Sequence, residues 1–171
     1  MHAQAHDWVA AHVPAAPADD AEVAVLEIGS LDINGSVRPL FPDATHYHGL
    51  DLVAGTGVDE VADAARWTPP RTYDVVVSAE VLEHAPAWRD ILTMMLGATA
   101  PGGTMLLTCA GPGRAPHSAV DGLDVRPGEH YANVSPADVR ALLRECGLTT
   151  WSLEWAAARG DLYLRVDLPA A

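Results

Sequence analysis

Acidic side chains end two apolar stretches of this sequence, and a glycine turn follows the first of them. Val23–Ile28 is apolar except for Glu27, and Gly29 opens the turn. Asp51 ends the second stretch about 20 residues later, where nucleotide-binding sheets carry an acid for the ribose. A buried strand, a tight glycine turn and a helix N-terminus present free backbone N–H groups at one point. The pattern predicts a nucleotide-cofactor site.

The turn itself limits the choice of cofactor. A dinucleotide fingerprint, Gly-x-Gly-x-x-Gly, needs glycines where this chain has Gly29, Leu31 and Asn34. The second glycine lets the backbone approach a pyrophosphate, and a leucine side chain would obstruct that approach. A cofactor without a pyrophosphate meets no such obstacle. Because Leu31 favours a negative φ, we expect Asn34-Gly35 to take the tight bend.

Apolar runs that indicate strands alternate with helical periodicities along the chain. Strands are expected near 23–28, 46–52, 73–78, 104–109, 149–156 and 161–167, and residues 58–64 form a short helix or another strand. Helices are expected over 5–12, over 87–99, and from Pro136 with Ser135 as N-cap. The expected inner face of the last helix carries Val139, Leu142, Leu143 and Cys146. A short helix limited by Pro39 and Pro42 follows the first turn. The alternation predicts an α/β fold, a single Rossmann-like, doubly wound and mostly parallel sheet of about seven strands.

The chain divides by composition into a short leading segment and one main domain. Residues 1–20 read as an N-terminal helix and a Pro/Ala/Asp-rich linker, and residues 21–171 as the cofactor-binding domain. Residues 110–134 are rich in Gly, Pro and charge and too long for a plain connection. We expect this loop to act as a substrate wall or lid.

Charge and lysine content exclude several functions. The formal net charge is −13, which argues against a broad nucleic-acid surface. All ten basic residues are arginine. The absence of lysine removes the lysine-dependent phosphate loop, Schiff-base catalysis and the Tyr-x-x-x-Lys pair of short-chain dehydrogenases.

Segment hydropathy and cysteine usage suggest a location. The sequence has no apolar run of 18 or more residues and no signal-like start, so we expect no membrane contact. Cys109 and Cys146 lie far apart without metal-binding spacing, which favours reduced thiols in a cytoplasmic protein. The sequence leaves the oligomeric state open, and a homodimer is compatible with it.

Several short motifs, in order, resemble the class I S-adenosylmethionine-dependent methyltransferases of the small-molecule branch. They are Val25-Leu26-Glu27-Ile28-Gly29-Ser30, Gly49-Leu50-Asp51, Ala62-Asp63-Ala64, the stretch from Tyr73 through Glu80-Val81-Leu82-Glu83-His84, and Pro101–Thr108. The resemblance covers most of the chain. It departs from the family at the first turn, where Leu31 and Ile33 replace two glycines that members commonly carry.

The resemblance implies roles for nine residues around S-adenosyl-L-methionine as the cofactor. Gly29, Ser30 and Glu27 would hold the methionine part, Asp51 the ribose hydroxyls, Leu52 an adenine face, Asp63 and Ala64 the adenine edge, and Glu80 and Val81 the methionine end. The alternative for Asp51 is a strand-end acid that caps the next turn. For Glu27 it is a buried acid bonded to backbone.

The reaction implied is in-line transfer of a methyl group to a small-molecule or carrier-presented acceptor. His84, His117 or His130 could accept the acceptor's proton, and His84 could instead be a helix-start residue bonded to backbone. Arg114 or Arg126 could hold an anionic acceptor. A metal-assisted variant through His117 with Asp121 or Asp124 is less favoured because no tight ligand pattern is present, so we expect no metal.

Two other functions remain open from the sequence. A catalytically silent module that binds S-adenosylmethionine or S-adenosylhomocysteine and serves as a partner protein would tolerate the lost glycines. An NAD(P)-dependent Rossmann oxidoreductase is less favoured because of Leu31 and the missing lysine.

Overall fold

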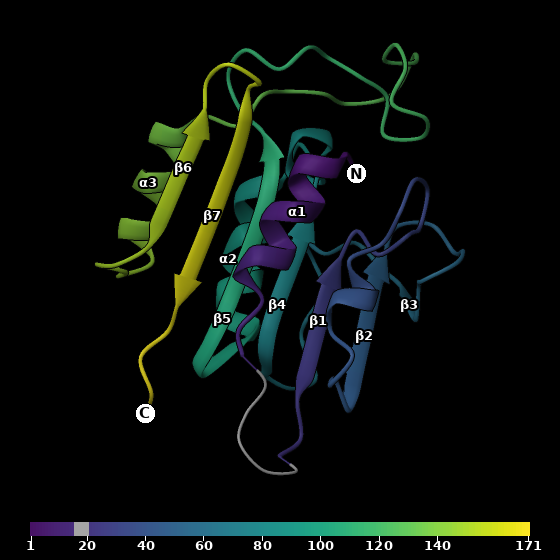
Figure 1. Ribbon diagram of the computed structural model, residues 1–171. Coiled ribbons are helices and arrows are strands. Elements are labelled where there is room, and N and C mark those ends of the chain that lie inside the picture. The colour runs from purple at the N-terminus through teal and green to yellow at the C-terminus, as the bar shows by residue number, and fades with distance from the viewer. Residues whose placement is uncertain (16–20) are drawn as a thin grey trace.

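A computed structural model describes residues 1–15 and 21–171, and its frame is one seven-stranded sheet (Figure 1). The strands are β1 (Ala24–Ile28), β2 (His46–Asp51), β3 (Glu60–Val61), β4 (Tyr73–Ala79), β5 (Thr99–Ala110), β6 (Ser152–Ala156) and β7 (Asp161–Asp167). Their order is β3-β2-β1-β4-β5-β7-β6. β1 to β5 run parallel, and β7 pairs antiparallel with β5 and β6. The predicted doubly wound sheet is confirmed.

Helices cover both faces of the sheet. They are α1 (Ala3–His12), α2 (Trp88–Ala98) and α3 (Pro136–Glu145), with the single turns η1 (Arg38–Leu40) and η2 (Leu82–His84). In Figure 1, α1 lies in front of the sheet, while α2 and α3 lie behind it. Within the described residues, no helix has the length and apolar character needed to cross a bilayer.

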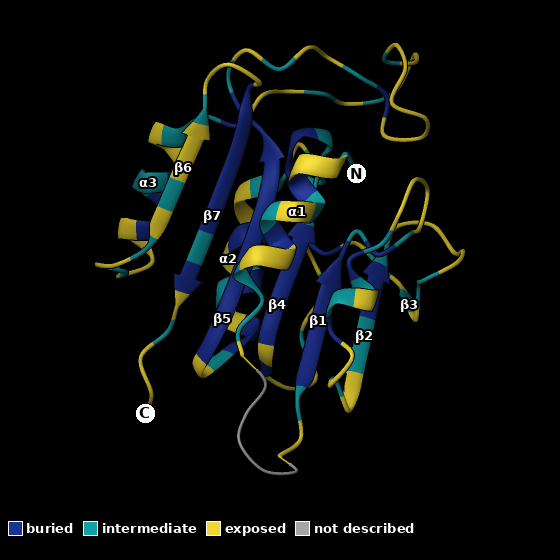
Figure 2. Cartoon of the chain, in the orientation of Figure 1, coloured by how far each residue is buried: buried dark blue, intermediate teal, exposed yellow. Residues whose placement is uncertain are grey.

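The hydrophobic core has two layers because the central strands are buried on both faces. Leu26 and Ile28 of β1 point into the layer formed with α2 and α3. Val25 points to the other face, where it packs with Val9 of α1. All five residues of β1 are buried, so the strand appears dark in Figure 2. An unbroken apolar run in the sequence is therefore the signature of a central parallel strand.

The local predictions differ from the structure in three places. The helix expected after the first turn is only η1, since prolines fix φ and remove backbone donors there. The strand expected at 104–109 begins at Thr99, directly after α2, where it pairs with Tyr73. Cys146, predicted on the inner face of α3, is exposed because the helix ends one residue earlier.

The predicted N-cap of α3 is present, whereas part of the predicted linker cannot be compared with the structure. Ser135 caps α3 as expected, and its Oγ accepts hydrogen bonds from the N–H groups of Ala137 (3.2 Å) and Asp138 (3.4 Å). The linker predicted before residue 21 includes 16–20, which lie outside the described residues.

Candidate functional site

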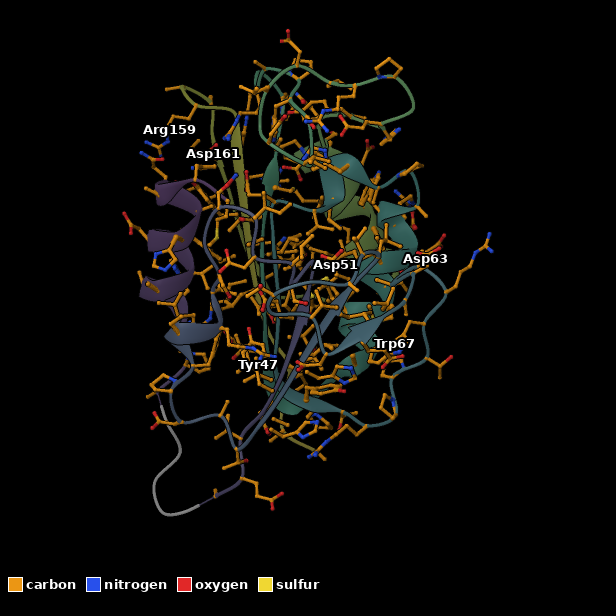
Figure 3. All side chains as sticks on the ribbon, turned by 90° about the vertical axis from the view of Figure 1, so that its right-hand side faces the viewer. Tyr47, Asp51, Asp63, Trp67, Arg159 and Asp161 are labelled. Atoms are coloured by element: carbon orange, nitrogen blue, oxygen red, sulfur yellow. The ribbon has the colours of Figure 1, made fainter. Side chains whose placement is uncertain are left out.

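A cavity of about 540 Å³ opens at the carboxyl ends of the parallel strands. Its wall includes all nine residues that the resemblance assigns to the cofactor: Glu27, Gly29, Ser30, Asp51, Leu52, Asp63, Ala64, Glu80 and Val81. These residues come from the ends of β1, β2 and β4 and from the loop after β3. Figure 3 shows Asp51 and Asp63 in one region, apart from Arg159 and Asp161.

The corner after β1 requires glycine at its first position. Gly29 has φ +79°, and a Cβ there would lie 2.2 Å from Cγ2 of Val81. The N–H groups of Gly29 and Ser30 donate to the carbonyl of Leu50, at 2.8 and 3.2 Å. The end of β1 is thus bonded to the backbone of β2, and the Val81 side chain packs directly on Gly29, which makes a cradle of bare backbone at the cavity wall.

The residues that replace the family's further glycines fit this corner. Leu31 packs its Cδ1 against Gly55, where a Cβ would lie only 2.3 Å away. Gly35, at φ +108°, takes the bend, and its N–H donates to Oδ1 of Asp32 at 2.8 Å. Ile33 is exposed. The expected reshaping of the loop is present, and the cavity remains open beside it.

Glu27 is a buried acid with one strong partner. Tyr47 donates its hydroxyl to Oε2 of Glu27 at 2.7 Å, and the guanidinium of Arg38 lies 4.3 Å from the Tyr47 ring centroid. Burial raises the pKa of Glu27 to about 7, although the hydrogen bond from Tyr47 lowers it. The carboxylate can therefore gain or lose its proton near neutral pH.

Asp51 has capacity beyond its local bonds. Its Oδ2 accepts from the N–H of Leu31 at 3.1 Å, and its Oδ1 accepts from Val53 at 3.0 Å. These bonds join the first turn to the end of β2 and match the capping alternative. Each carboxylate oxygen has two lone pairs, so both oxygens can accept a further hydrogen bond from the cavity.

The adenine-side residues follow β2 and β3. Leu52 is 68% exposed and lines the cavity, so its side chain is available to pack against a ligand there. Asp63 accepts from the N–H of Ala65 through Oδ1 at 3.0 Å. Ala64 is buried. The structure places an apolar surface and a carboxylate side by side there.

Glu80 is strained and tightly held. It is the one non-glycine residue with positive φ, +60°, among those described. Its Oε1 accepts from Thr108 at 3.0 Å, and its Oε2 lies 3.2 Å from Nε2 of His2. Burial would raise the pKa of Glu80, but His2, Thr108 and Arg114 together hold it below its ordinary value.

Two of the three candidate histidines lie together. The rings of His84 and His117 are 5.0 Å apart, and Tyr131 lies within 5.5 Å of both. Burial, helped by His117, lowers the pKa of His84, so its imidazole is neutral at pH 7. His84 lines the cavity. His130 is exposed and lies outside the cavity wall, and its catalytic role stays a prediction.

Sequence reasoning missed Glu83, which adjoins this cluster. Its side chain is fully buried, and burial together with the charge of Glu80 raises its pKa to about 8. The dipeptide Glu83-His84 directly after a buried strand was the available signal. Nothing local in the sequence shows that the carboxylate turns inward.

The two loop arginines already have acidic partners. Arg114 pairs with Asp161 and lies 3.7 Å from Glu80. Arg126 pairs with Asp121. Neither arginine is part of the cavity wall.

The residues present fit S-adenosylmethionine. The glycine cradle after β1 can receive the methionine part, and the ionised form of Glu27 suits an ammonium group. Asp51 has free lone pairs for ribose hydroxyls. The exposed Leu52 offers an apolar face for the adenine.

Comparison with known proteins gives the family. A family described as "Methyltransferase domain" matches residues 2–153. The chain belongs to this methyltransferase family. The predicted membership of a methyltransferase family is thereby confirmed.

One curated relative is trans-aconitate 2-methyltransferase from Streptomyces avermitilis. It is 31% identical over 117 residues, which are 59% of this chain and 43% of the relative. The matching region thus spans less than half of that protein.

Two solved structures share the fold. A complex of DhpI with S-adenosylhomocysteine has a TM-score of 0.62 and 24% identity, covering 89% of this chain and 80% of that one. Phosphoethanolamine N-methyltransferase 2 from Haemonchus contortus, with S-adenosylmethionine bound, has a TM-score of 0.70 and 14% identity. That match covers 97% of this chain and 52% of the other.

Proposed function

We propose that this chain binds S-adenosylmethionine in the strand-end cavity and methylates a small molecule held at the His84 end. The observation that carries the proposal is one cavity whose wall holds both the cofactor-type acids and the His84 side chain. When bound, this cofactor supplies a methyl group on a positively charged sulfur, which a nucleophile can displace in line.

We assign the nine cavity residues the roles that the resemblance implies. Glu27, Gly29 and Ser30 bind the methionine part, with Glu80 and Val81 beside it. Asp51 accepts hydrogen bonds from the ribose, and Leu52, Asp63 and Ala64 hold the adenine. Their shared position in one cavity wall supports these roles.

The acceptor end is small and mostly apolar. Ala85, Pro86 and Ala87 line it from the segment between η2 and α2, and Ile91 lines it from α2. Ala119 and Val120 reach it from the long loop. The contribution of Ala119 and Val120 supports residues 110–134 as the wall or lid on the acceptor side. A cavity of this size suits a small ligand better than a macromolecule.

His84 is the base that the geometry favours for a hydroxyl or amine acceptor. A neutral imidazole at the cavity wall can take a proton, which is typically worth ~10²–10⁴-fold in rate. His117 lies against His84 and can take the proton onward. A carboxylate acceptor would need no base.

The finer expectations on partners and location remain predictions. An anionic acceptor held by Arg114 or Arg126 would have to compete with the carboxylates that already pair with them. The free thiols of Cys109 and Cys146 support a cytoplasmic location. We also expect the protein to bind neither nucleic acid nor membranes. A homodimer remains compatible with the sequence.

The test is turnover with methyl-labelled cofactor and separate pools of small carboxylic acids, phenols and amines. We expect label in one pool, and in the His84→Ala variant a lower kcat for a hydroxyl or amine acceptor with unchanged binding of S-adenosylhomocysteine. Tight binding of S-adenosylhomocysteine without transfer to any pool, or to the small molecules of a cell extract, would instead favour the silent module.

A further inference from the structure

Glu83 is a buried acid without a hydrogen-bond partner in the part of the chain that the structure describes. Its side chain is 0% exposed, and neither carboxylate oxygen has a hydrogen-bond partner among the described residues. Leaving a buried polar group unpaired is costly, and more so when the group is charged. The nearby guanidinium of Arg114 already serves Asp161 and Glu80. Such a group calls for a ligand.

Two imidazoles converge on the same point. One ligand atom from each of Glu83, His84 and His117 lies within 4.8 Å of the other two. Two ligands about 2.1 Å from a common ion stand ~3–4 Å apart, so the three atoms are close to the spacing that one ion requires. Nδ1 of His84 is also buried and without a hydrogen bond to any residue described.

The orientation of His117 fits a metal ligand. Its Nδ1 lies 3.1 Å from the carbonyl of Ala115, and because a carbonyl can only accept, Nδ1 carries the proton. That bond leaves the lone pair on Nε2. Ligating histidines commonly donate their other ring nitrogen to a carbonyl in this way, which fixes the ring.

The loop that carries His117 is tied to the strand ends. Ala132 donates its N–H to the carbonyl of Glu83, and Val134 donates to Ala110, both at 2.8 Å. The ring of Tyr131 closes one side of the cluster, with its centroid 4.9 Å from that of His117. The end of the loop is therefore held to Glu83 by backbone pairing, and His117 is held by its bond to Ala115 and by the Tyr131 ring.

We propose that Glu83, His84 and His117 bind one divalent transition-metal ion of the Zn²⁺ type. Two imidazoles and one carboxylate form a ligand set that suits such ions, whereas Mg²⁺ and Ca²⁺ prefer oxygen ligands alone. This departs from the expectation of no metal, which rested on the absence of a local ligand pattern.

The site adjoins the acceptor end, because His84 is part of the cavity wall. Three protein ligands leave coordination positions open, as in catalytic zinc sites. This part of the inference rests on the proposed function: the open position takes an oxygen of the acceptor. With the ion bound, His84 and His117 would be its ligands and would no longer act as bases. An acceptor hydroxyl held there would lose its proton to solvent, and its oxygen would form the new bond to the methyl carbon. The electron pair of the broken carbon–sulfur bond stays on sulfur.

The test uses the whole chain, stripped with a chelator and free of cofactor and acceptor. Calorimetric titration with ZnCl₂ should give one ion per chain, and Co²⁺ should give visible absorption typical of a site with nitrogen ligands. His117→Ala, a change in an exposed loop that should fold normally, should weaken Zn²⁺ binding at least tenfold. His46→Ala, an exposed histidine of β2 outside the cluster, should leave it unchanged.

The Zn²⁺ affinity of Glu83→Gln is measured in the same way and should also fall. The folding of this variant is checked by circular dichroism. A Zn²⁺ affinity equal to wild type in His117→Ala, or no Co²⁺ absorption at all, would overturn the metal site. Binding of S-adenosylhomocysteine is measured on the same samples without metal. The proposed function and the metal site can therefore fail separately.

Discussion

Asp51 connects the first turn to the end of β2, because its two carboxylate oxygens accept from backbone N–H groups on either side of the cavity rim. Glu27 and Asp63 stand at two other strand ends around the same space. Each acid has a local partner and spare acceptor capacity. At the scale of single residues, the site is thus prepared by the protein's own hydrogen bonds before any ligand arrives.

Removing the Asp51 carboxylate should weaken cofactor binding. In Asp51→Ala the ribose would lose its acceptor, which corresponds to ~1.5–3 kcal/mol for hydrogen bonds to a charged group. We expect the Kd for S-adenosylhomocysteine, measured by calorimetry, to rise roughly 10- to 100-fold. The control is Asp43→Ala, an exposed aspartate outside the cavity wall, which should bind as wild type. An unchanged Kd in Asp51→Ala would leave only the capping role.

Glu27 should make cofactor binding depend on pH. Its pKa is about 7, and the ionised form is the one that attracts an ammonium group. Between pH 6 and 8 the ionised fraction grows about tenfold, so the Kd for S-adenosylhomocysteine should fall by up to that factor. Glu27→Gln should bind more weakly with a flat profile. A wild-type profile without slope would contradict this role.

The raised pKa of Glu27 has the opposite effect on stability, because it lowers the free energy of unfolding as pH rises. The raised pKa means that the native state keeps a proton that the unfolded chain loses near pH 4.5. The contribution of Glu27 to the free energy of unfolding should therefore fall as pH rises from about 4.5 to about 7, and stay constant above. Urea unfolding of wild type and Glu27→Gln across this range measures the difference.

The corner after β1 is the element that shapes the cavity. Gly29 leaves room for the Val81 side chain, and the Leu31 side chain packs against Gly55 while it lines the cavity. Apolar runs sufficed to predict the strands, because central strands are buried on both faces. The start of β5 at Thr99 could not be read locally, since it depends on pairing with Tyr73.

Two glycine-to-alanine changes distinguish a glycine that the backbone conformation requires from one that only weakens a helix. Gly29→Ala places a Cβ 2.2 Å from Val81 at positive φ, so it should lower the free energy of unfolding by ~1–3 kcal/mol. Gly97→Ala lies within α2, with nothing within 4 Å of the added Cβ, and should raise it by ~0.5–1 kcal/mol. Urea denaturation measures both. Equal effects of the two changes would contradict the steric account of the corner.

Some of the site residues could be predicted from the sequence and others could not. The acids and Gly29 follow strands, so their meeting at one edge of a parallel sheet could be predicted from order alone. His117 approaches His84 and Glu83 through an irregular loop. No sequence periodicity reports such an approach, and the grouping with Glu83 was missed for that reason.

At the scale of the whole molecule, α1 closes the face of the sheet opposite α2 and α3. Trp8 stacks on Tyr163 of β7 with ring centroids 5.3 Å apart, and Arg165 donates to the carbonyl of His12 at 3.0 Å. Met1 reaches the cavity wall, and His2 contacts Glu80. The leading helix thus shares both the core and the site with the rest of the chain.

This packing predicts that α1 contributes to global stability. Val9→Ala removes fully buried methyl groups and should lower the free energy of unfolding by ~1–3 kcal/mol. Val61→Ala, the same change at a 54% exposed edge position, should stay within ~0.5 kcal/mol of wild type. Thermal and urea unfolding measure both. If Val9→Ala unfolds like Val61→Ala, α1 does not belong to the cooperative unit.

A crystal structure with S-adenosylhomocysteine would show directly how the cavity is used. We expect the ligand in the strand-end cavity, with its amino acid part at Gly29, both ribose hydroxyls on the Asp51 carboxylate, and the sulfur directed toward His84. Density for the ligand elsewhere, or a cavity closed by Leu31 with Asp51 bonded to backbone alone, would contradict this expectation.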